Sequence, residues 1–201
     1  MVAAFAASPF AIRGSFWYNV AVFVDGGVRQ NGEHCMEVTK KKLKVYCETS
    51  FVSWLVSRPS TVPDHAVKQA YTRKWWNECA PLCELFASGF VIKEAAFGDV
   101  DQSALRLAEL TKFNILDGEA AEISTLASRL LATHAVPEKE TADAFHIATA
   151  AVYGMDILLT WNCKHMANLI TLPKTASVIA ANGYECPKIL TPKDALEVEY
   201  D

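Results

Sequence analysis

Apolar residues alternate along the chain between two spacings, and this alternation predicts an α/β protein. Short apolar runs bounded by polar residues are typical of buried strands, whereas apolar residues three and four positions apart indicate helices that bury one face. The predicted strands are the runs 43–48, 90–94, 113–117, 156–161 and 186–190. Because helical segments separate these runs, we expect a three-layer α/β/α domain with a mostly parallel central sheet.

The predicted helices carry their own start and stop signals. Thr49 or Ser50 is placed to cap the first helix, and Pro63 suits the first turn of the second. Gly89 and Gly154 are placed to end two of the others. The predicted helical segments are 49–58, 63–80, 81–88, 99–112, 118–134, 141–154, a stretch from about 166, and 191–196.

Residues 1–40 differ from the rest and are treated as an N-terminal extension to a domain of residues 41–201. The run 16–24 has the composition of a strand and is followed by a turn, which favours a β-hairpin. A start site assigned upstream of a native Met36 is the other explanation. Asp25, at the end of this run, is not assigned to any site. The apolar beginning lacks a basic region, so we expect neither a signal peptide nor a membrane anchor.

Composition narrows the class of function. The net charge of −4 excludes a protein that coats nucleic acid through an overall positive charge. The 51% apolar content indicates a folded globular chain. Six cysteines without a CxxC pair indicate free thiols in the reducing cytoplasm, not a disulfide framework or a cysteine-based zinc site.

Acidic residues follow the predicted strands at positions where a parallel sheet binds ligands. Glu48 ends the first strand, Glu94 ends the second, and Asp143 lies in the first turn of a later helix. Because ligands bind beyond the carboxyl ends of parallel strands, we expect these side chains to converge. Converging carboxylates need a cation, and oxygen ligands favour Mg²⁺ or Mn²⁺. Such ions activate a water molecule to hydrolyse a phosphodiester bond.

Four motifs support the same chemistry by resemblance. The segments VYCETS (45–50), VIKE (91–94), TADAFHIATA (141–150) and LLTWNCKH (158–165) resemble, in order and spacing, the four motifs of PIN domains. The resemblance covers roughly residues 43–190. The stretch LLTWNCKHMAN is particularly similar to VapC-type toxins of toxin–antitoxin pairs. The resemblance therefore implies a metal-dependent endoribonuclease that acts on RNA. It also implies silencing by a cognate antitoxin and assembly as a homodimer.

The same resemblance implies roles for individual residues. The metal ligands are Glu48, Glu94 and Asp143; Asn162 takes the fourth acidic position; Ser50 and Thr160 support the site by hydrogen bonds; and Lys164 is placed for phosphate contact. Two positions depart from the family. Glu48 stands where the family usually has Asp, which can shift the metal, and Asn162 removes one charge, which weakens a second metal site.

Other interpretations remain open. The two departures favour a PIN-like fold retained as an inactive binding or assembly module, and a nuclease acting on single-stranded or flap DNA is a further alternative. Taken alone, Glu48 is better interpreted as a helix cap, and Glu94, the least certain of the three acids, as a solvated surface residue. His146 and His165 each lie three residues after a candidate site residue, so a transition-metal site is conceivable, although a core or supporting role is favoured.

Trp75 and Trp76 lie beside basic residues, a combination that also occurs in proteins that stack on RNA bases. Adjacent tryptophans on a helix more often pack against the core or an interface. We therefore expect this pair to pack.

Overall fold

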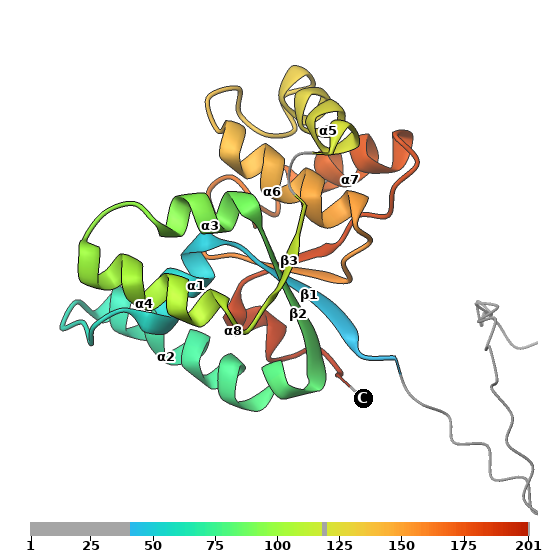
Figure 1. Ribbon diagram of the computed structural model, residues 1–201. Helices are drawn as coiled ribbons and strands as arrows, with labels where there is room; N and C mark the ends of the chain where they lie inside the picture. Colours follow the sequence, from blue (N-terminus) through green and yellow to red (C-terminus); the bar gives the residue numbers. More distant parts are fainter. Residues whose placement is uncertain (1–40, 118–119, 201) are drawn as a thin grey trace, which may run out of the picture. The chain divides into compact units, whose positions relative to one another are not determined.

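A five-stranded parallel sheet forms the centre of the molecule. The computed structural model describes residues 41–117 and 120–200, which belong to one compact unit spanning Lys40–Asp201. The strand order is β3-β2-β1-β4-β5, and every described pairing is parallel (Figure 1). This confirms the predicted α/β class. The strands are β1 Leu43–Cys47, β2 Cys83–Ser88, β3 Asn114–Leu116, β4 Ile157–Leu159 and β5 Lys188–Leu190.

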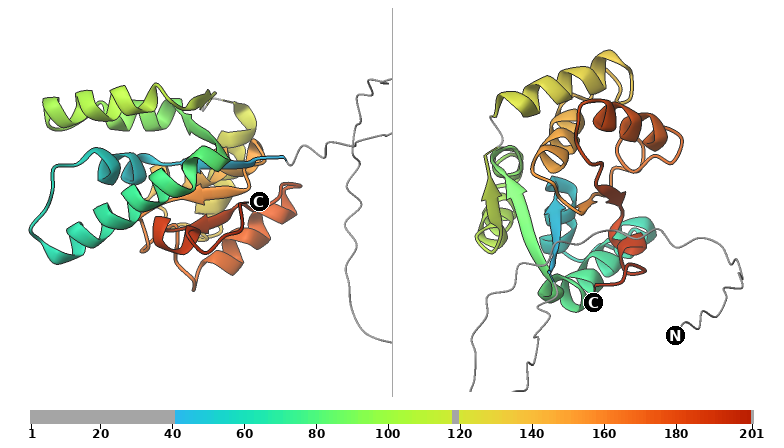
Figure 2. Two further views of the ribbon diagram at one scale, coloured as in Figure 1. Left: turned by 90° about the horizontal axis from the view of Figure 1, so that it is seen from below. Right: turned by 90° about the vertical axis from the view of Figure 1, so that its right-hand side faces the viewer.

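Helices cover both faces of the sheet. They are α1 Thr49–Val56, α2 Pro63–Glu78, the short 3₁₀ helix η1 Ala80–Leu82, α3 Gly89–Ala95, α4 Val100–Leu110, α5 Ala121–Ala132, α6 Thr141–Val152, α7 Leu172–Ala181 and α8 Pro192–Ala195. Helices α5, α6 and α7 lie together on one side of the sheet, and α2 and α8 lie on the other (Figures 1 and 2). Helix α1 packs against both α2 and α4. The result is the three-layer arrangement that the sequence predicts.

The direction in which strands are added reverses beside β1. The chain first adds β2 and β3 on one side of β1 and then adds β4 and β5 on the other. Tyr46 accordingly pairs with Phe86 on one side and with Leu158 on the other. In sheets of this kind, the loops after the two central strands separate and leave a crevice at the carboxyl edge. The chain segments that follow β1 and β4 therefore define the expected site.

Local sequence explains where several helices begin and end. Pro63 opens α2, where its missing N–H costs nothing. The side chains of Asp99 and Thr191 accept hydrogen bonds from backbone N–H groups in the first turns of α4 and α8. Gly154 follows α6 with φ +61°, a conformation that glycine adopts without steric cost.

The second strand lies earlier in the chain than the sequence predicts. Residues 83–88 form β2, not a helix, and residues 90–94 belong to helix α3, not to a strand. The run Phe90–Ile92 has strand composition, but Val91 and Ala95, four residues apart, are the fully buried positions, as on a helix. Gly89 begins the helix instead of ending one. Packing against the rest of the domain has overridden local propensity.

Two further boundaries differ from the prediction, and one segment is not described. Glu48, not Thr49 or Ser50, caps α1. The helix expected from about Met166 begins at Leu172, because the preceding residues form turns around the carbonyls of Asn162 and Asn168. The predicted hairpin or misassigned start in residues 1–40 lies outside the described residues. Within the described ranges, no helix combines the length and the apolar character needed to cross a bilayer.

The tryptophan pair packs, as expected. Trp75 is fully buried, meets Phe51 edge-on at 5.5 Å between ring centroids, and donates a hydrogen bond of 2.7 Å from Nε1 to the hydroxyl of Tyr200. Trp76 stacks on Phe113 at 5.7 Å. These contacts tie α2 to α1 and to the end of the domain.

Truncating the central sheet tests this core. Leu158→Ala removes a fully buried side chain of β4 and is expected to lower the free energy of unfolding by about 2–5 kcal/mol. Leu169→Ala makes the same change at a side chain that is 84% exposed and should shift it by less than about 0.5 kcal/mol. Urea denaturation compares the two, and equal effects would contradict the described packing.

Candidate functional site

Glu48 follows the central strand and lies beside the end of β4. Its backbone N–H donates to the carbonyl of Leu159 at 3.2 Å. The residue is 5% exposed, and its carboxylate turns back onto its own helix. Oε2 accepts a hydrogen bond from the backbone N–H of Ser50 at 2.8 Å, and Oε1 accepts one from the Ser50 hydroxyl. The capping role considered from the sequence is therefore real. It places a nearly buried carboxylate at the predicted crevice.

Glu94 reaches the same region from the last turn of α3, not from the end of a strand. Its Oε2 accepts a hydrogen bond from the Thr49 hydroxyl and lies 3.0 Å from Nε2 of His146. Burial acts to raise the pKa of Glu94, but the hydrogen bond and charge of His146, together with the Thr49 hydroxyl, outweigh it and hold the pKa below the ordinary 4.5. Glu94 is therefore a carboxylate at neutral pH.

His146 connects this carboxylate to the core. The imidazole is 2% exposed, and its Nδ1 lies 2.9 Å from the Tyr46 hydroxyl, which lies 2.8 Å from the Ser88 hydroxyl. Burial acts to lower the pKa of His146. The hydrogen bond to Glu94 and the surrounding carboxylates have the larger combined effect, so the pKa lies above 6.5. The ring thus links the carboxylate of Glu94 to two buried hydroxyl groups of the core.

Asp143 lies in the first turn of α6, as predicted, and its partner is Asn162. The Asn162 amide donates from Nδ2 to Oδ2 of Asp143 at 2.7 Å, and its Oδ1 accepts from the backbone N–H of His165 at 3.1 Å. Burial raises the pKa of Asp143 above the ordinary 3.8, even though His165 and His146 oppose the change. Asn162 therefore positions its neighbours with both ends of its amide.

The remaining predicted residues surround these acids. The Ser50 hydroxyl also accepts from the backbone N–H of Trp161 at 2.8 Å and so joins the segments after β1 and β4. The buried Thr160 hydroxyl accepts from the backbone N–H of Asn162 at 2.8 Å. Both thus form the supporting hydrogen bonds that were expected. Lys164 is exposed, two residues beyond Asn162, and its contact with phosphate stays a prediction.

The three predicted acids share one electrostatic environment. Glu48, Glu94 and Asp143 each raise the pKa of His146, so all three act on the same buried ring. Their described ion pairs run to histidines rather than to lysine or arginine: Glu94 to His146, and Asp143 to His165 at 3.4 Å. A histidine can release its charge by losing a proton, whereas a structural arginine cannot. The arrangement is therefore open to neutralisation by a metal ion.

A tighter set of ligand atoms lies beside these residues and includes an acid that the sequence reasoning missed. Among the described residues, Glu140, Asp143 and His165 bring their ligand atoms within 4.8 Å of one another, whereas Glu48 and Glu94 do not belong to this set. Glu140 precedes α6, three residues before Asp143, and that spacing alone places it on the same side of the helix. The three-residue spacing of Glu140 and Asp143 is thus the sequence signal that points to this acid.

The donor chemistry at the carboxyl edge fits the divalent ion that the resemblance implies. Glu48, Glu94 and Asp143 supply carboxylate oxygens, the ligands that Mg²⁺ and Mn²⁺ prefer. Burial of Glu48 and Asp143 makes their uncompensated charge costly, so a cation gains more here than at an open surface.

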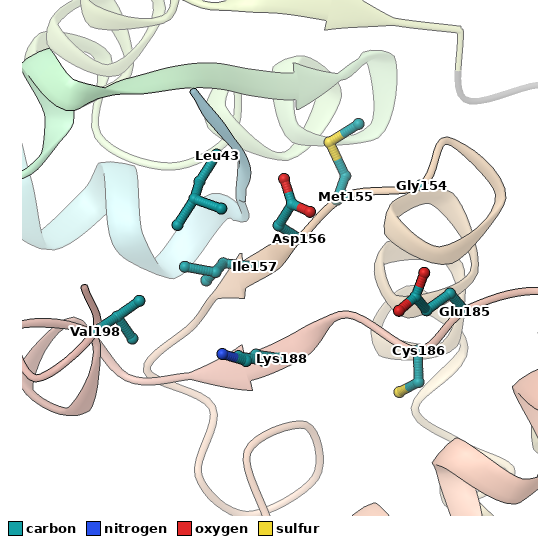
Figure 3. A pocket seen from close by; sticks show the side chains of 9 residues that line it. All are labelled: Leu43, Gly154, Met155, Asp156, Ile157, Glu185, Cys186, Lys188 and Val198. Carbon is teal, nitrogen blue, oxygen red and sulfur yellow. The ribbon is translucent and has the colours of Figure 1, made fainter. Parts of the chain in front are cut away.

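A separate cavity lies at the opposite edge of the sheet. It has a volume of about 230 Å³ and is lined at the amino ends of the strands by Leu43, Ile157 and Lys188, together with Asp156 and Cys186 (Figure 3). Oδ2 of Asp156 accepts from the backbone N–H of Lys44 at 2.7 Å, so this acid holds two strands together. The cavity shares no residue with the predicted site.

Comparison with known proteins finds similarity in fold. No protein-family model matches the chain, and no curated protein matches it in sequence. The chain resembles the solved structure of Mycobacterium tuberculosis VapC20, a toxin that cleaves the sarcin–ricin loop, at 19% identity and a TM-score of 0.43 over 57% of this chain and 86% of that one.

Two solved VapBC complexes bound to DNA are similar as well. The Salmonella typhimurium complex matches at 13% identity and a TM-score of 0.48, over 75% of this chain and 98% of that one. VapBC2 of Rickettsia felis, bound to a promoter fragment, matches at 14% and 0.47, over 74% and 98%. At these identities the likeness says nothing about side chains at the site.

The buried ion pair predicts a pH-dependent stability. His146→Gln keeps a hydrogen-bond donor near Glu94 but removes the charge, and should lower the free energy of unfolding of the metal-free protein by about 1–3 kcal/mol. The raised pKa of His146 stabilises the fold at low pH, and this contribution is lost as pH rises through that pKa, above 6.5. The lowered pKa of Glu94 adds a contribution that is lost as pH falls through it, below 4.5.

The difference between parent and His146→Gln should therefore be largest between these two values and should shrink on either side. Urea denaturation across pH measures it. The matched control is His134→Gln, at a histidine that is 67% exposed. A difference that does not change with pH would show that His146 carries no charge in the folded protein.

Proposed function

We propose that the chain is a metal-dependent endoribonuclease of the PIN-domain class, with Glu48, Glu94 and Asp143 as the ligands of a Mg²⁺ or Mn²⁺ ion. One observation carries the proposal. Glu94 of α3 lies 3.0 Å from Nε2 of the buried His146, and Glu48 at the end of β1 and Asp143 of α6 both act to raise the pKa of that imidazole. Among the described residues, the ion pairs of Glu94 and Asp143 run to histidines and not to lysine or arginine, which favours a metal site over a structural salt bridge.

The four sequence motifs support the same assignment. The first motif forms β1 and the cap of α1, the third forms α6, and the fourth forms β4 and the turn after it. The second motif lies on α3 and still delivers Glu94 to this edge. On this proposal, segments far apart in the chain supply the acids of one metal site, as the resemblance implies.

The chain's own side chains would hold the reacting groups in place. A divalent ion at this site would activate water and stabilise negative charge on the scissile phosphate. Ser50 fixes the carboxylate of Glu48, and Thr49 and His146 fix that of Glu94. Asn162 fixes Asp143. Lys164 is placed to contact a phosphate of the RNA. Water would add to phosphorus as the 3′ oxygen leaves.

The proposal extends to the biological role. The likeness of LLTWNCKHMAN to VapC-type toxins supports a toxin that acts in the cytoplasm as a homodimer and that a cognate antitoxin protein silences. Expression of the parent chain alone should then arrest growth, whereas an inactive site variant should not.

Asp143→Asn tests the nuclease directly. The variant should lose metal-dependent cleavage of single-stranded RNA by at least roughly 100-fold, because several kcal/mol of charge stabilisation disappear. Its thermal transition should persist. The control is Asp101→Asn, which changes a side chain that is 80% exposed. Equal cleavage by Asp143→Asn and the parent would refute the assignment, and cleavage of DNA but not RNA would favour the alternative substrate.

Metal titration separates an active nuclease from an inactive module. Mg²⁺ or Mn²⁺ at about 100 times its dissociation constant stabilises a folded protein by about 2.7 kcal/mol, which corresponds to a rise in Tm of about 5–10 °C for a domain of this size. Glu94→Gln should abolish most of this rise, whereas Glu84→Gln should retain it. A parent protein whose Tm ignores both ions would favour the module that lacks catalysis.

A further inference from the structure

A histidine and two carboxylates form a compact cluster beside the proposed nuclease site. Glu140 precedes α6, Asp143 lies in its first turn, and His165 belongs to the turn after β4. Nδ1 of His165 lies 3.4 Å from Oδ2 of Asp143 and 3.6 Å from Oε2 of Glu140. The side chains are 14–28% exposed, so the cluster is largely buried but remains in contact with solvent.

The spacing of these atoms is informative. An N–H···O hydrogen bond spans about 2.7–3.2 Å, so both separations are longer than a hydrogen bond between the groups. Four ligands placed tetrahedrally at about 2.0–2.2 Å from Zn²⁺ lie about 3.3–3.6 Å from one another. Neighbouring ligands in an octahedral Mg²⁺ site lie closer, at about 2.8–3.0 Å. The observed separations match the tetrahedral case.

The ligands are held in position by a residue between them. Asn162 donates to Asp143 and accepts from the backbone of His165, so one side chain orients two members of the cluster. Metal sites commonly use such outer hydrogen bonds to fix the orientation of their ligands. The hydrogen bonds of Asn162 therefore fix two of the three proposed ligands, which distinguishes the cluster from unsupported acidic residues on a surface.

We propose that Glu140, Asp143 and His165 bind a first-row transition-metal ion of the Zn²⁺ type, with solvent in the fourth position. Imidazole nitrogen suits zinc and its neighbours but not Mg²⁺, which prefers an all-oxygen site. The described contacts of Asp143 use Oδ2, so Oδ1 remains for the ion of the proposed nuclease site. Binding at this cluster does not require nuclease activity.

Metal binding by the full, untagged chain tests the proposal. After chelator treatment, Zn²⁺ should bind in calorimetry, and Co²⁺ should give the strong visible absorption of a four-coordinate site. His165→Ala and Glu140→Gln should each weaken Zn²⁺ binding by at least about 100-fold. Excess Mg²⁺ should not displace Co²⁺.

Two controls match these changes. His134 and Glu138 form an exposed pair at the same 3.6 Å separation, so His134→Ala should leave Zn²⁺ binding unchanged. Cys163→Ser should also leave it unchanged, which excludes the exposed thiol next to Asn162 as the ligand. The proposal is overturned if His165→Ala and Glu140→Gln bind Zn²⁺ as the parent does, or if the Co²⁺ spectrum is that of a six-coordinate ion. Either result would mean that the cluster is an ion pair only.

The two proposals fail in different ways. Glu94→Gln should remove RNA cleavage and keep the Co²⁺ absorption, because Glu94 lies outside the cluster. Zinc binding that depends on His165 in a parent that cleaves no RNA would refute the nuclease and support this site. Cleavage of RNA by a chain whose zinc binding ignores His165 would refute this site alone.

Discussion

The described domain has to accommodate several partly buried carboxylates near the carboxyl edge of its parallel sheet. Removing a carboxylate from water is costly unless a nearby group compensates it. Here imidazole rings lie beside two of the carboxylates: His146 contacts Glu94 at 3.0 Å, and His165 lies 3.4 Å from Asp143. Imidazole can be a cation, a hydrogen-bond donor or a metal ligand, so the same residues suit the edge with and without a bound ion.

The topology explains why residues far apart in the chain meet at this edge. Because strands are added first on one side of β1 and then on the other, the segments after β1 and β4 part from each other there. Glu48 begins one segment and Asn162 lies in the other, and Ser50 joins the two by a hydrogen bond to Trp161. Helices α3 and α6 then contribute Glu94 and Asp143. The positions of these side chains are therefore set by strand order and helix packing rather than by proximity in the sequence.

The α/β architecture could be predicted from the sequence, whereas the contacts of the candidate site residues could not. Strands and amphipathic helices follow from local periodicity, which is why the α/β class was predictable. The run Phe90–Ile92 was misassigned because β-branched and aromatic residues favour strands locally, whereas here Val91 and Ala95 are buried together on one face of a helix. The pairing of His146 with Glu94 links residues 52 positions apart, and no local signal reports such a contact.

Asn162, which the motif resemblance aligns with an acidic position, contacts both Asp143 and the backbone of His165. A carboxylate at position 162 would add a charge beside Asp143, whose pKa burial already raises. The amide of Asn162 adds no charge and donates to that carboxylate while it also holds the backbone of His165. Asn162 therefore supports both of its neighbours, and it brings no charge of its own to the ligand atoms of Glu140, Asp143 and His165, which lie within 4.8 Å of one another.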